Sequence, residues 1–556
     1  MADFLFLKQT GSTGSKAAGK EVQPVPQRFE KCYGKTSGLE MIRGLSVYGL
    51  DKTYRMYRGG NGDSVVVLGA CYFPGKSIEK SLEEIAETFQ EANIAMLKRQ
   101  LAGQYILMIQ KDKILYMFSD NWGVRSIFYS EKCDTICSSL PVIEEIKGKA
   151  GKLDEYKVFE YLAIQYVLYY PGWISNGTLH KEIRMLRPFE YIVIDTQLCS
   201  VEVRSFRFQV DNRKENDKTV LSDRLIERMG SVILNPAFRD QKIGATLTGG
   251  YDSRLVVSIA NTYYDYIEYR IGVSDENPST KKEAATAKRL ARLMAKPLHE
   301  SLTGKDTIED FEFLTSGMSP VQNHVIASII QEAGRYELGF GGCFGTEAFK
   351  PLPPYQSDEE FIAGRIERAK SFLKVPEEMW QRLESEIRRE LELIRHHYLL
   401  LEPNYLDSIH ILYLLNTGVF STFMLSPYNI YGMQVEPYAH YSVFELALQV
   451  PLRFKPGSLW VGGGFLQKEA MTKINPTLGK VLTTHSRPML PCTLTTFGRY
   501  FYHYFKDKTR IYSNIFRARL KKEPPLENFE TIIDGVSHIP NGTEVFFKKK
   551  VASYCV

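Results

Sequence analysis

The fold of this chain is decided by the stretch Ile243-Gly-Ala-Thr-Leu-Thr-Gly-Gly-Tyr-Asp-Ser-Arg-Leu-Val-Val257. Its apolar beginning predicts a short buried strand, its paired glycines predict a turn, and its end predicts the first turns of a helix. This arrangement points free backbone N–H groups and the positive end of a helix dipole at an anion. We therefore expect an anion-binding loop here, with a simple capped glycine turn as the alternative.

The residue types in the turn suit the pyrophosphate part of a nucleotide. Gly249 and Gly250 lack a Cβ atom, so the backbone can come close to phosphate. Thr248 and Ser253 offer hydroxyl groups, and Asp252 offers a hard oxygen ligand for the Mg²⁺ ion that accompanies a nucleotide. The expected nucleotide-binding set in this stretch is Leu247, Thr248, Gly249, Gly250, Asp252 and Ser253.

The segment Thr248-Gly-Gly-Tyr-Asp-Ser253 resembles the Ser-Gly-Gly-x-Asp-Ser loop of the N-type ATP pyrophosphatases, in the form found in asparagine synthetase and its relatives. Thr replaces the first Ser and keeps the hydroxyl group. The resemblance implies a domain in which ATP is cleaved between its α- and β-phosphates and a substrate carboxylate is captured as an acyl-adenylate. ATP and Mg²⁺ are then the expected cofactors.

The pattern after the loop predicts an α/β doubly wound parallel sheet with added helices. A helix from 253 to 260 leads to a buried strand at 266–273, and apolar residues at helical spacing follow from Lys281 to Ala295. This rhythm is typical of a sheet whose ligands lie at the carboxyl ends of its strands. The resemblance implies that the main chain of Ile271 and Gly272 holds the adenine.

A second glycine-rich segment, 338–347, resembles the family's Gly-Asp-Gly-x-Asp-Glu loop, the other wall of the phosphate and metal site. It adds Gly342 to the expected nucleotide-binding residues. Cys343 stands where the family has the Mg²⁺-ligating Asp, and a thiol is a poor ligand for this ion. Glu347 is retained, so the expected metal ligands are Asp252 and Glu347.

Three residues nearer the carboxyl end are candidates for catalysis. Glu436 lies close to where some relatives keep a Glu that serves as base for the acceptor. The segment 476–488 matches a stretch that ends, in relatives, in a Lys that touches the adenylate. Lys480 and Arg487 are alternatives for that cation, which would balance charge developing on the phosphate and acyl oxygens.

Residues 1–205 carry mainly strand patterns, with helical spacing from Ile78 to Leu101 and a strand, tight turn and strand between Ile114 and Tyr129. This half resembles the amino-terminal, Ntn-hydrolase-like glutaminase domain of class II amidotransferases, which implies an α+β two-layer sheet sandwich with helices outside. Ala2 stands where that family has its nucleophilic cysteine. We expect a remnant without glutamine hydrolysis; the alternative is that processing makes Cys32 terminal.

Composition sets the broad class. The chain has 556 residues, 44% hydrophobic and 24% charged, and a formal net charge of +5, which predicts a folded protein of more than one domain and favours no nucleic-acid partner. No apolar run approaches the ~18 residues of a transmembrane segment. The eight cysteines are scattered, and no secretory signal opens the chain, so we expect a reducing cytoplasm.

Taken together, the sequence predicts two domains, 1–205 and 206–556, and an ATP-dependent, AMP-forming carbon–nitrogen ligase similar to β-lactam synthetases and lasso-peptide cyclases. The expected partners are a small-molecule or peptide carboxylate and an amine, and a homodimer is compatible with this hypothesis. Two alternatives stay open. One is amidation by free ammonia on the same fold, and the other is a non-catalytic scaffold protein.

Overall fold

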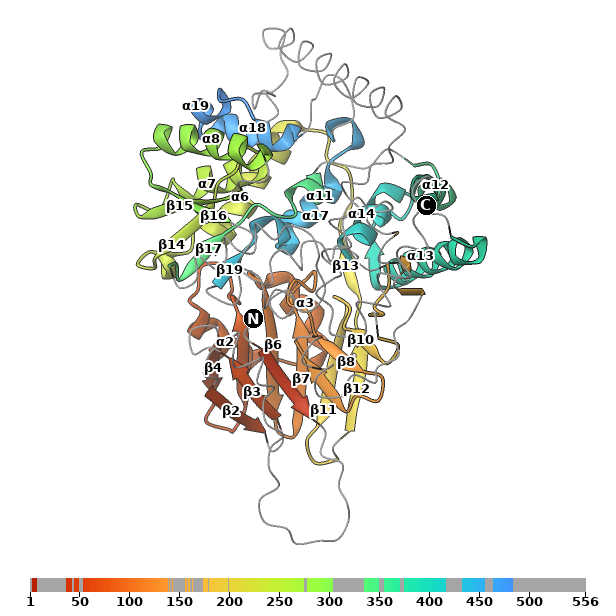
Figure 1. The fold of residues 1–556 in the computed structure, drawn as a ribbon. Helices are drawn as coiled ribbons and strands as arrows, with labels where there is room; N and C mark the ends of the chain where they lie inside the picture. Colours follow the sequence, from red (N-terminus) through yellow and green to blue (C-terminus); the bar gives the residue numbers. More distant parts are fainter. Residues whose placement is uncertain are drawn as a thin grey trace.

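Two six-stranded antiparallel sheets form the first part of the computed structural model (Figure 1). The first has the order β10-β8-β9-β1-β3-β2, with bounds Ile183–Met185, Phe128–Ser130, Thr135–Cys137, Asp3–Leu7, Leu45–Gly49 and Ser37–Ile42. The second has the order β12-β11-β7-β6-β5-β4, with bounds Ser200–Ser205, Glu190–Asp195, Ile114–Ser119, Tyr105–Lys111, Ser64–Gly69 and Tyr54–Arg58.

The structure describes these strands and residues 54–138, 180–198, 200–274, 278–303, 335–349, 355–370, 375–416, 433–455 and 464–483, with scattered residues between 140 and 178. Within these ranges, no helix is both long enough and apolar enough to cross a lipid bilayer.

Strand β5 shows why the two sheets stack. Val66 and Leu68 belong to a buried cluster that also contains Ile127 and Ile136 from the other sheet. Their neighbours on β5 point to the opposite face, because successive side chains alternate along a strand, and there they pack with helix α2 (Ile78–Thr88). All six residues of β5 are buried. The predicted two-layer sandwich with helices outside is therefore confirmed.

Of two local predictions for this half, one is confirmed and one is wrong. The helical spacing from Ile78 to Leu101 corresponds to two helices, because the chain is extended at Phe89 and Gln90 before a short 3₁₀ turn (Glu91–Asn93) and helix α3 (Ile94–Gln100). The predicted strand, tight turn and strand is not a hairpin, because β7 and β8 lie in different sheets.

The turn after β7 explains how the chain changes sheet. The carboxylate of Asp120 accepts hydrogen bonds from the backbone N–H groups of Trp122, Val124 and Arg125, at 3.1, 3.0 and 3.0 Å. Gly123 has a φ of 64°, which favours glycine. Asp120 thus organises a wide turn that carries the chain across the sandwich instead of back along β7.

A five-stranded parallel sheet forms the core of the second part, with the order β16-β15-β14-β17-β19 (Figure 1). Its strands are Leu298–Thr303, Ile267–Ser274, Ile243–Thr246, Leu338–Phe340 and Met433–Val435. The chain builds outward from β14 to β16 and then returns to the other side of β14. This is the doubly wound order, as predicted.

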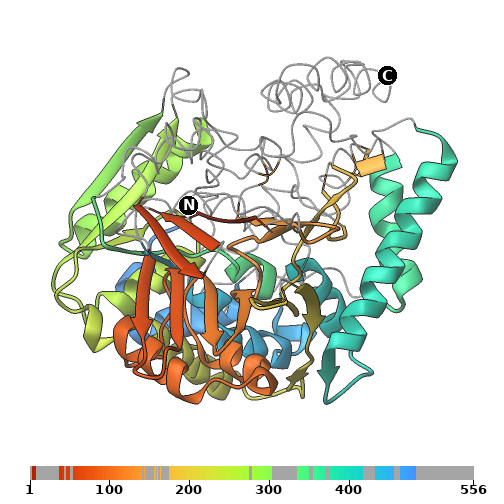
Figure 2. The same cartoon turned by 90° about the horizontal axis from the view of Figure 1, so that it is seen from below.

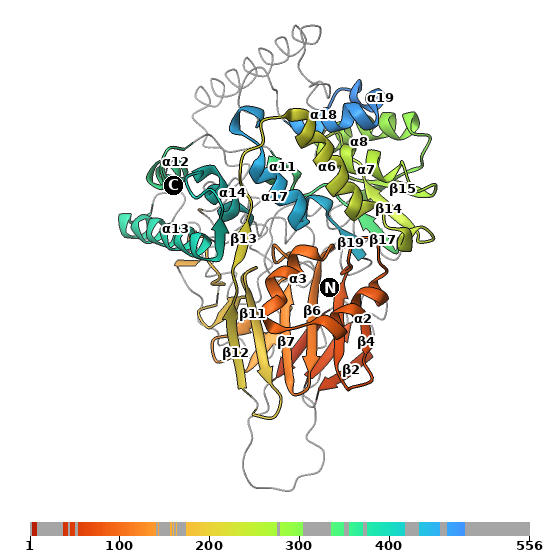
Figure 3. The ribbon, with the colours of Figure 1, turned by 180° about the vertical axis from the view of Figure 1, so that it is seen from behind.

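Helices surround this sheet and extend beyond it. Those that connect or cover the strands are α6 (Lys218–Ile233), α7 (Asp252–Ala260), α8 (Pro278–Leu293), α11 (Gly345–Phe349), α17 (Tyr441–Gln449), α18 (Phe465–Ile474) and α19 (Pro476–Gly479). Seen from behind, α18 lies beside α6 and α7 (Figure 3). The remaining helices are α12 (Asp358–Lys370), α13 (Glu377–His397) and α14 (Leu406–Asn416), and α13 lies on the side opposite β15 and β16 (Figure 2).

Helix α17 joins the parallel sheet to the sandwich. The indole N–H of Trp122 donates to the backbone oxygen of Ala439 at 2.7 Å, and its ring meets that of Phe444 edge-on at 4.5 Å between centroids. Strand β12 ends at Ser205, and the next strand, β13 (Phe208–Val210), pairs in parallel with β18 (Tyr398–Leu400). The division of the chain at residue 205 stays a prediction.

Candidate functional site

The Thr248–Ser253 loop lies at the topological switch point of the parallel sheet. It follows β14, and the segment 341–345 follows the neighbouring strand β17, so both begin at the carboxyl ends of adjacent strands. These strands lead into connections on opposite sides of the sheet, and ligands of doubly wound sheets bind where the order reverses. The order of the strands therefore selects these two segments, independently of any motif.

Hydrogen bonds within the loop hold its turn. The backbone N–H of Thr248 donates to Ser253 Oγ at 3.1 Å, and the two hydroxyl groups are 2.9 Å apart. The N–H of Gly250 donates to Thr248 Oγ1 at 3.2 Å. Leu247 is buried, and its N–H continues the β14–β15 ladder by donating to Arg270 O at 3.0 Å. A phosphate bound here would exchange the bonds inside the turn for bonds to its own oxygens.

Arg254 fixes the loop from behind. It is fully buried, and its guanidinium donates to the carbonyl oxygens of Gly249 at 3.1 Å, Leu478 at 3.2 Å and Val481 at 2.7 Å. Burial lowers the pKa of Arg254 to about 10, so the side chain stays charged at neutral pH. Arg254 therefore ties the glycine turn to the end of α19.

The second glycine segment packs directly on the first. A Cβ atom added to Gly342 would lie 2.6 Å from the backbone nitrogen of Ser253, and one added to Gly345 would lie 2.6 Å from the carboxyl group of Asp252. Between them, Phe344 is buried and has a φ of 69°, a left-handed conformation that is rare for a bulky residue. Gly342 thus meets the backbone of the first loop and Gly345 meets the side chain of Asp252, and both approaches are too close for any residue with a Cβ atom.

Two other glycines of this segment, Gly339 and Gly341, lie against a buried polar chain from β19. Cβ atoms added there would lie 2.3 Å from Gln434 Oε1 and 1.8 Å from Glu436 Oε1. Gly339 and Gly341 therefore contact the side chains of Gln434 and Glu436, at the end of β19. Gly342 and Gly345 contact the Asp252 loop on the other side.

Glu436 is buried and bonded on several sides. Its Oε2 accepts from the N–H of Cys343 at 2.8 Å, and its Oε1 accepts from the side chain of Gln434, also at 2.8 Å. Its backbone N–H donates to the side-chain oxygen of Gln104, from the sandwich, at 3.0 Å. These contacts suit a residue that holds the second loop in place from the sandwich side, whereas the sequence suggested a base for an acceptor.

Helix α18 contributes two polar residues that the sequence analysis did not select. Gln467 and Lys468 are fully buried, although they lie in an amphipathic segment where polar residues usually face solvent. Gln467 Nε2 donates to Asp252 Oδ1 at 3.1 Å, and Lys468 Nζ lies 5.0 Å from the centroid of the Tyr251 ring. The sequence carries no signal for their burial, because polar and apolar residues alternate in turn-like groups along 465–471 as in an ordinary surface helix.

The other expected residues are distributed as follows. Lys480 is exposed, on the segment that Arg254 ties to the loop. Arg487 and the side chain of Glu347 lie outside the described residues.

The pairing of β15 shows which way the backbone groups of Ile271 and Gly272 point. These are the two residues expected to hold the adenine. Arg270 faces β14, since its carbonyl oxygen accepts from Leu247. Backbone groups alternate along a parallel strand, so those of Ile271 face β16, and those of Gly272 face the side of β14 just beyond its end.

The residues present fit a divalent cation that arrives with phosphates. In the described part of the chain, no group of three or more His, Cys, Asp or Glu side chains is arranged to hold a metal. Asp252, at the amino end of α7, is the carboxylate beside the glycine turn. Mg²⁺ commonly binds through one or two carboxylates, water and substrate phosphates, so Asp252 fits this ion in the presence of a nucleotide.

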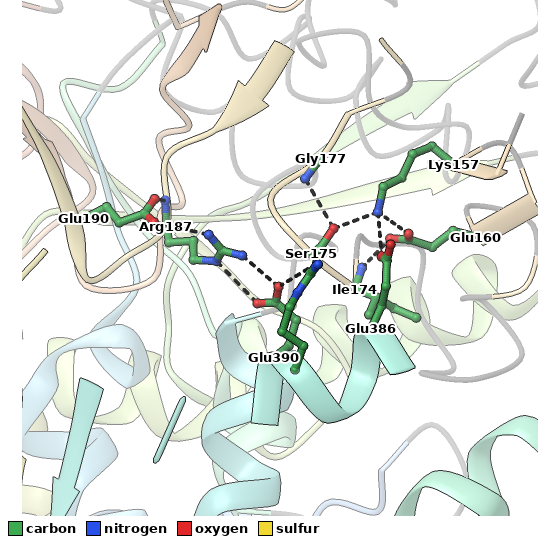
Figure 4. A network of polar contacts seen from close by, with 10 residues as sticks. Lys157, Glu160, Ile174, Ser175, Gly177, Arg187, Glu190, Glu386 and Glu390 are labelled. Carbon is green, nitrogen blue, oxygen red and sulfur yellow. Dashed lines mark hydrogen bonds and ion pairs between the residues drawn. The ribbon is translucent and has the colours of Figure 1, made fainter. Parts of the chain in front are cut away.

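A second buried polar cluster lies where the sandwich meets α13 (Figure 4). The ammonium group of Lys157 donates to Ser175 Oγ at 2.7 Å and to Glu386 Oε2 at 3.0 Å, and it also pairs with Glu160. Burial raises the pKa of Glu160 to about 7, although Lys157 acts in the opposite direction. Two carboxylates therefore share one cation inside the protein.

Arg187 extends this cluster toward a small cavity. Its Nη2 donates to Glu390 Oε1 at 2.7 Å, and both residues line a cavity of about 20 Å³ (Figure 4). That volume holds about one water molecule. Since no nucleotide fits there, the cluster is a structural joint between the sandwich and α13.

No protein-family model and no curated protein matches this chain. One similar solved structure is a glutamine phosphoribosylpyrophosphate (PRPP) amidotransferase from B. subtilis complexed with ADP and GMP, at 9% sequence identity and a TM-score of 0.19. The match covers 46% of this chain and 49% of that one, so this chain spans about half of its length. Another is described as the allosteric regulatory enzyme of purine biosynthesis, at 10% identity and a TM-score of 0.20, covering 51% of this chain and 74% of that one. The fold assignment rests on the strand order and packing, because likeness at these scores adds nothing to it.

Proposed function

We propose that this chain is an ATP-dependent, AMP-forming ligase that adenylates a substrate carboxylate and joins it to an amine. The observation that carries the proposal is the position of the Thr248–Ser253 loop at the switch point of a doubly wound parallel sheet, facing a second glycine segment. The sequence of the loop, which resembles that of asparagine synthetase-like ATP pyrophosphatases, supports the same reaction class.

Each part of the site has its own role in the proposed reaction. The loop N–H groups and the amino end of α7 bind the β- and γ-phosphates, because the helix dipole favours negative charge there. Asp252 holds Mg²⁺, which neutralises charge on the departing pyrophosphate. The buried Lys468 adds positive charge near Tyr251. The cation that stabilises the adenylate is Lys480 or Arg487.

The chemistry balances without a further reactant. A carboxylate oxygen attacks the α-phosphorus, the bond to the bridging oxygen of the β-phosphate breaks, and pyrophosphate leaves. The amine nitrogen then attacks the acyl carbon, AMP leaves with the carboxylate oxygen, and the amine loses a proton to solvent. In the proposed reaction the amine attacks directly, and glutamine hydrolysis takes no part.

The experiment is to incubate the full chain with MgATP, a panel of carboxylic acids, and hydroxylamine as a reactive amine. We expect AMP and pyrophosphate in equal amounts, only with an acceptable acid, and a hydroxamate product. Formation of ADP and phosphate would contradict the proposal. Pyrophosphate release that requires ammonium salts would support ammonia-dependent amidation, and the absence of ATP binding would support the scaffold alternative.

A further inference from the structure

Gln467 bridges the two loops of the candidate site. It is fully buried, and it is the third residue of α18. Its Nε2 donates to Asp252 Oδ1 at 3.1 Å and lies 3.5 Å from the carbonyl oxygen of Gly345. One side chain from a helix more than 200 residues later in the sequence thus contacts both Asp252 and the second glycine segment.

The orientation of this amide follows from its partners. Asp252 Oδ1 and the oxygen of Gly345 are both acceptors, so the NH₂ group of Gln467 must face them. The opposite orientation would place two oxygens against each other. Gln467 Oε1 is then directed toward Gly464, where an added Cβ atom would lie 3.4 Å from it, and it is buried without a hydrogen-bond partner within the described ranges. A buried oxygen in this state costs free energy, so the contacts of the NH₂ group with the two loops must offset that cost.

The usual role of a glutamine at this position does not account for the geometry. A Gln at the third position of a helix often accepts from the N–H of the capping residue. The capping residue here is Gly464, with a φ of 61°, and its cap shows no side-chain hydrogen bond. The amide of Gln467 is instead used at the Asp252 loop.

The side chains near Asp252 supply little negative charge for a cation. Cys343 occupies the position of an expected acid, and its N–H is bonded to Glu436. A neutral amide, Gln467, lies beside Asp252, so the arrangement supplies less negative charge than a pair of acids would. When the protein supplies so little negative charge, Mg²⁺ is held mainly by the phosphates of the nucleotide.

We propose that Gln467 is a positioning residue for the nucleotide's divalent cation. It orients the Asp252 carboxylate through its NH₂ group and adds no negative charge beside it, so that the cation binds only together with the nucleotide. This inference rests on the proposed nucleotide site.

Two variants and two binding measurements test it. Manganese, detected by electron paramagnetic resonance, reports binding of the metal alone, and calorimetry gives the affinity for ATP with Mg²⁺ and with EDTA. For the wild type we expect no Mn²⁺ binding without nucleotide. Gln467→Glu places a second acid beside Asp252, keeps the shape of the side chain, and should produce measurable binding of Mn²⁺ alone.

Gln467→Leu removes both the donor and the oxygen. We expect the gain in ATP affinity that Mg²⁺ confers to fall about tenfold, while ATP affinity in EDTA stays within about twofold of the wild type. Three results would overturn this inference and leave the proposed function standing. The first is a Gln467→Leu variant in which Mg²⁺ raises ATP affinity as much as in the wild type. The others are a Gln467→Glu variant that binds Mn²⁺ no better than the wild type, and a wild type that binds Mn²⁺ without nucleotide. A wild type that binds no ATP in either condition would overturn the proposed function as well.

Discussion

The substitution Gly250→Ala separates a phosphate-binding loop from an ordinary glycine turn. A Cβ atom at this position would meet one neighbour, Thr248 Oγ1 at 3.3 Å, and no other atom within 4 Å outside the adjacent residues. The backbone φ lies outside the left-handed region. Alanine lowers the conformational entropy of the unfolded chain, worth about 0.4–1 kcal/mol, and the close contact offsets part of that gain. We expect the free energy of unfolding to change by less than about 1 kcal/mol.

Binding should respond much more strongly than stability. A phosphate oxygen must come within about 3 Å of the loop N–H groups to form hydrogen bonds, and the new methyl group would occupy that space. We expect the Kd for MgATP to rise at least about tenfold, which corresponds to about 1.4 kcal/mol. Isothermal titration calorimetry measures the Kd, and denaturant unfolding measures stability on the same preparation.

The matched control is Gly60→Ala, in a turn of the sandwich where an added Cβ atom has no neighbour within 4 Å. It should leave the Kd for MgATP unchanged and raise the free energy of unfolding by no more than about 1 kcal/mol. If Gly250→Ala binds MgATP as tightly as this control, phosphate does not approach the glycine turn. If it loses several kcal/mol of stability, the space at Gly250 has been misjudged. Either result would refute the reasoning.

Three further substitutions test other contacts. Lys468→Met removes a buried positive charge near Tyr251, so MgATP affinity should fall about tenfold and become less dependent on salt concentration; equal salt dependence in calorimetry would contradict this. Gln104→Ala removes the acceptor for the N–H of Glu436 and should lower the free energy of unfolding by about 1–3 kcal/mol in denaturant titrations, whereas no loss would mean that this bond does not hold the second loop. Glu160 has a pKa of about 7 against an ordinary value of 4.5, so the folded state retains a proton that the unfolded chain releases, and its contribution to stability is lost as pH rises from about 4.5 to about 7. Glu160→Gln should lack this decline when unfolding is measured across that range, and a parallel pH dependence in both proteins would contradict it.

The regular elements of the parallel sheet could be predicted because their signals are local. The apolar run at the start of 243–257 forms β14, the glycines form the turn, and the helix begins at Asp252. The doubly wound class followed from the rhythm of strand and helix, since right-handed crossovers leave few other topologies.

Which sheet each strand of the sandwich joins could not be predicted from the sequence. Alternating residues correctly indicated strands at β7 and near β8, but not the sheet that each joins. That choice depends on the carboxylate of Asp120, which organises a wide turn by accepting from three backbone N–H groups. A tight hairpin turn and this turn have similar composition.

The candidate site was predictable only where it is contiguous in sequence. The glycine-rich segment around Gly342 was predicted as a second wall of the phosphate site, but the sequence does not state that two of its glycines contact Gln434 and Glu436 and two contact the Asp252 loop. Gln467 and Lys468 reach the loop from more than 200 residues away through the packing of α18 on α7. Periodicity assigns such residues to a helix, and only the tertiary structure shows what they contact.

The most direct test of the central claim is a crystal structure of the full chain with Mg²⁺ and a non-hydrolysable ATP analogue. We predict that the β- and γ-phosphates lie within hydrogen-bonding distance of the N–H groups of the Thr248–Ser253 loop, with the cation bound by Asp252 and the carboxylate of Asp252 still accepting from Gln467. A triphosphate bound elsewhere on the protein, with this loop unchanged against Gly342, would contradict the account.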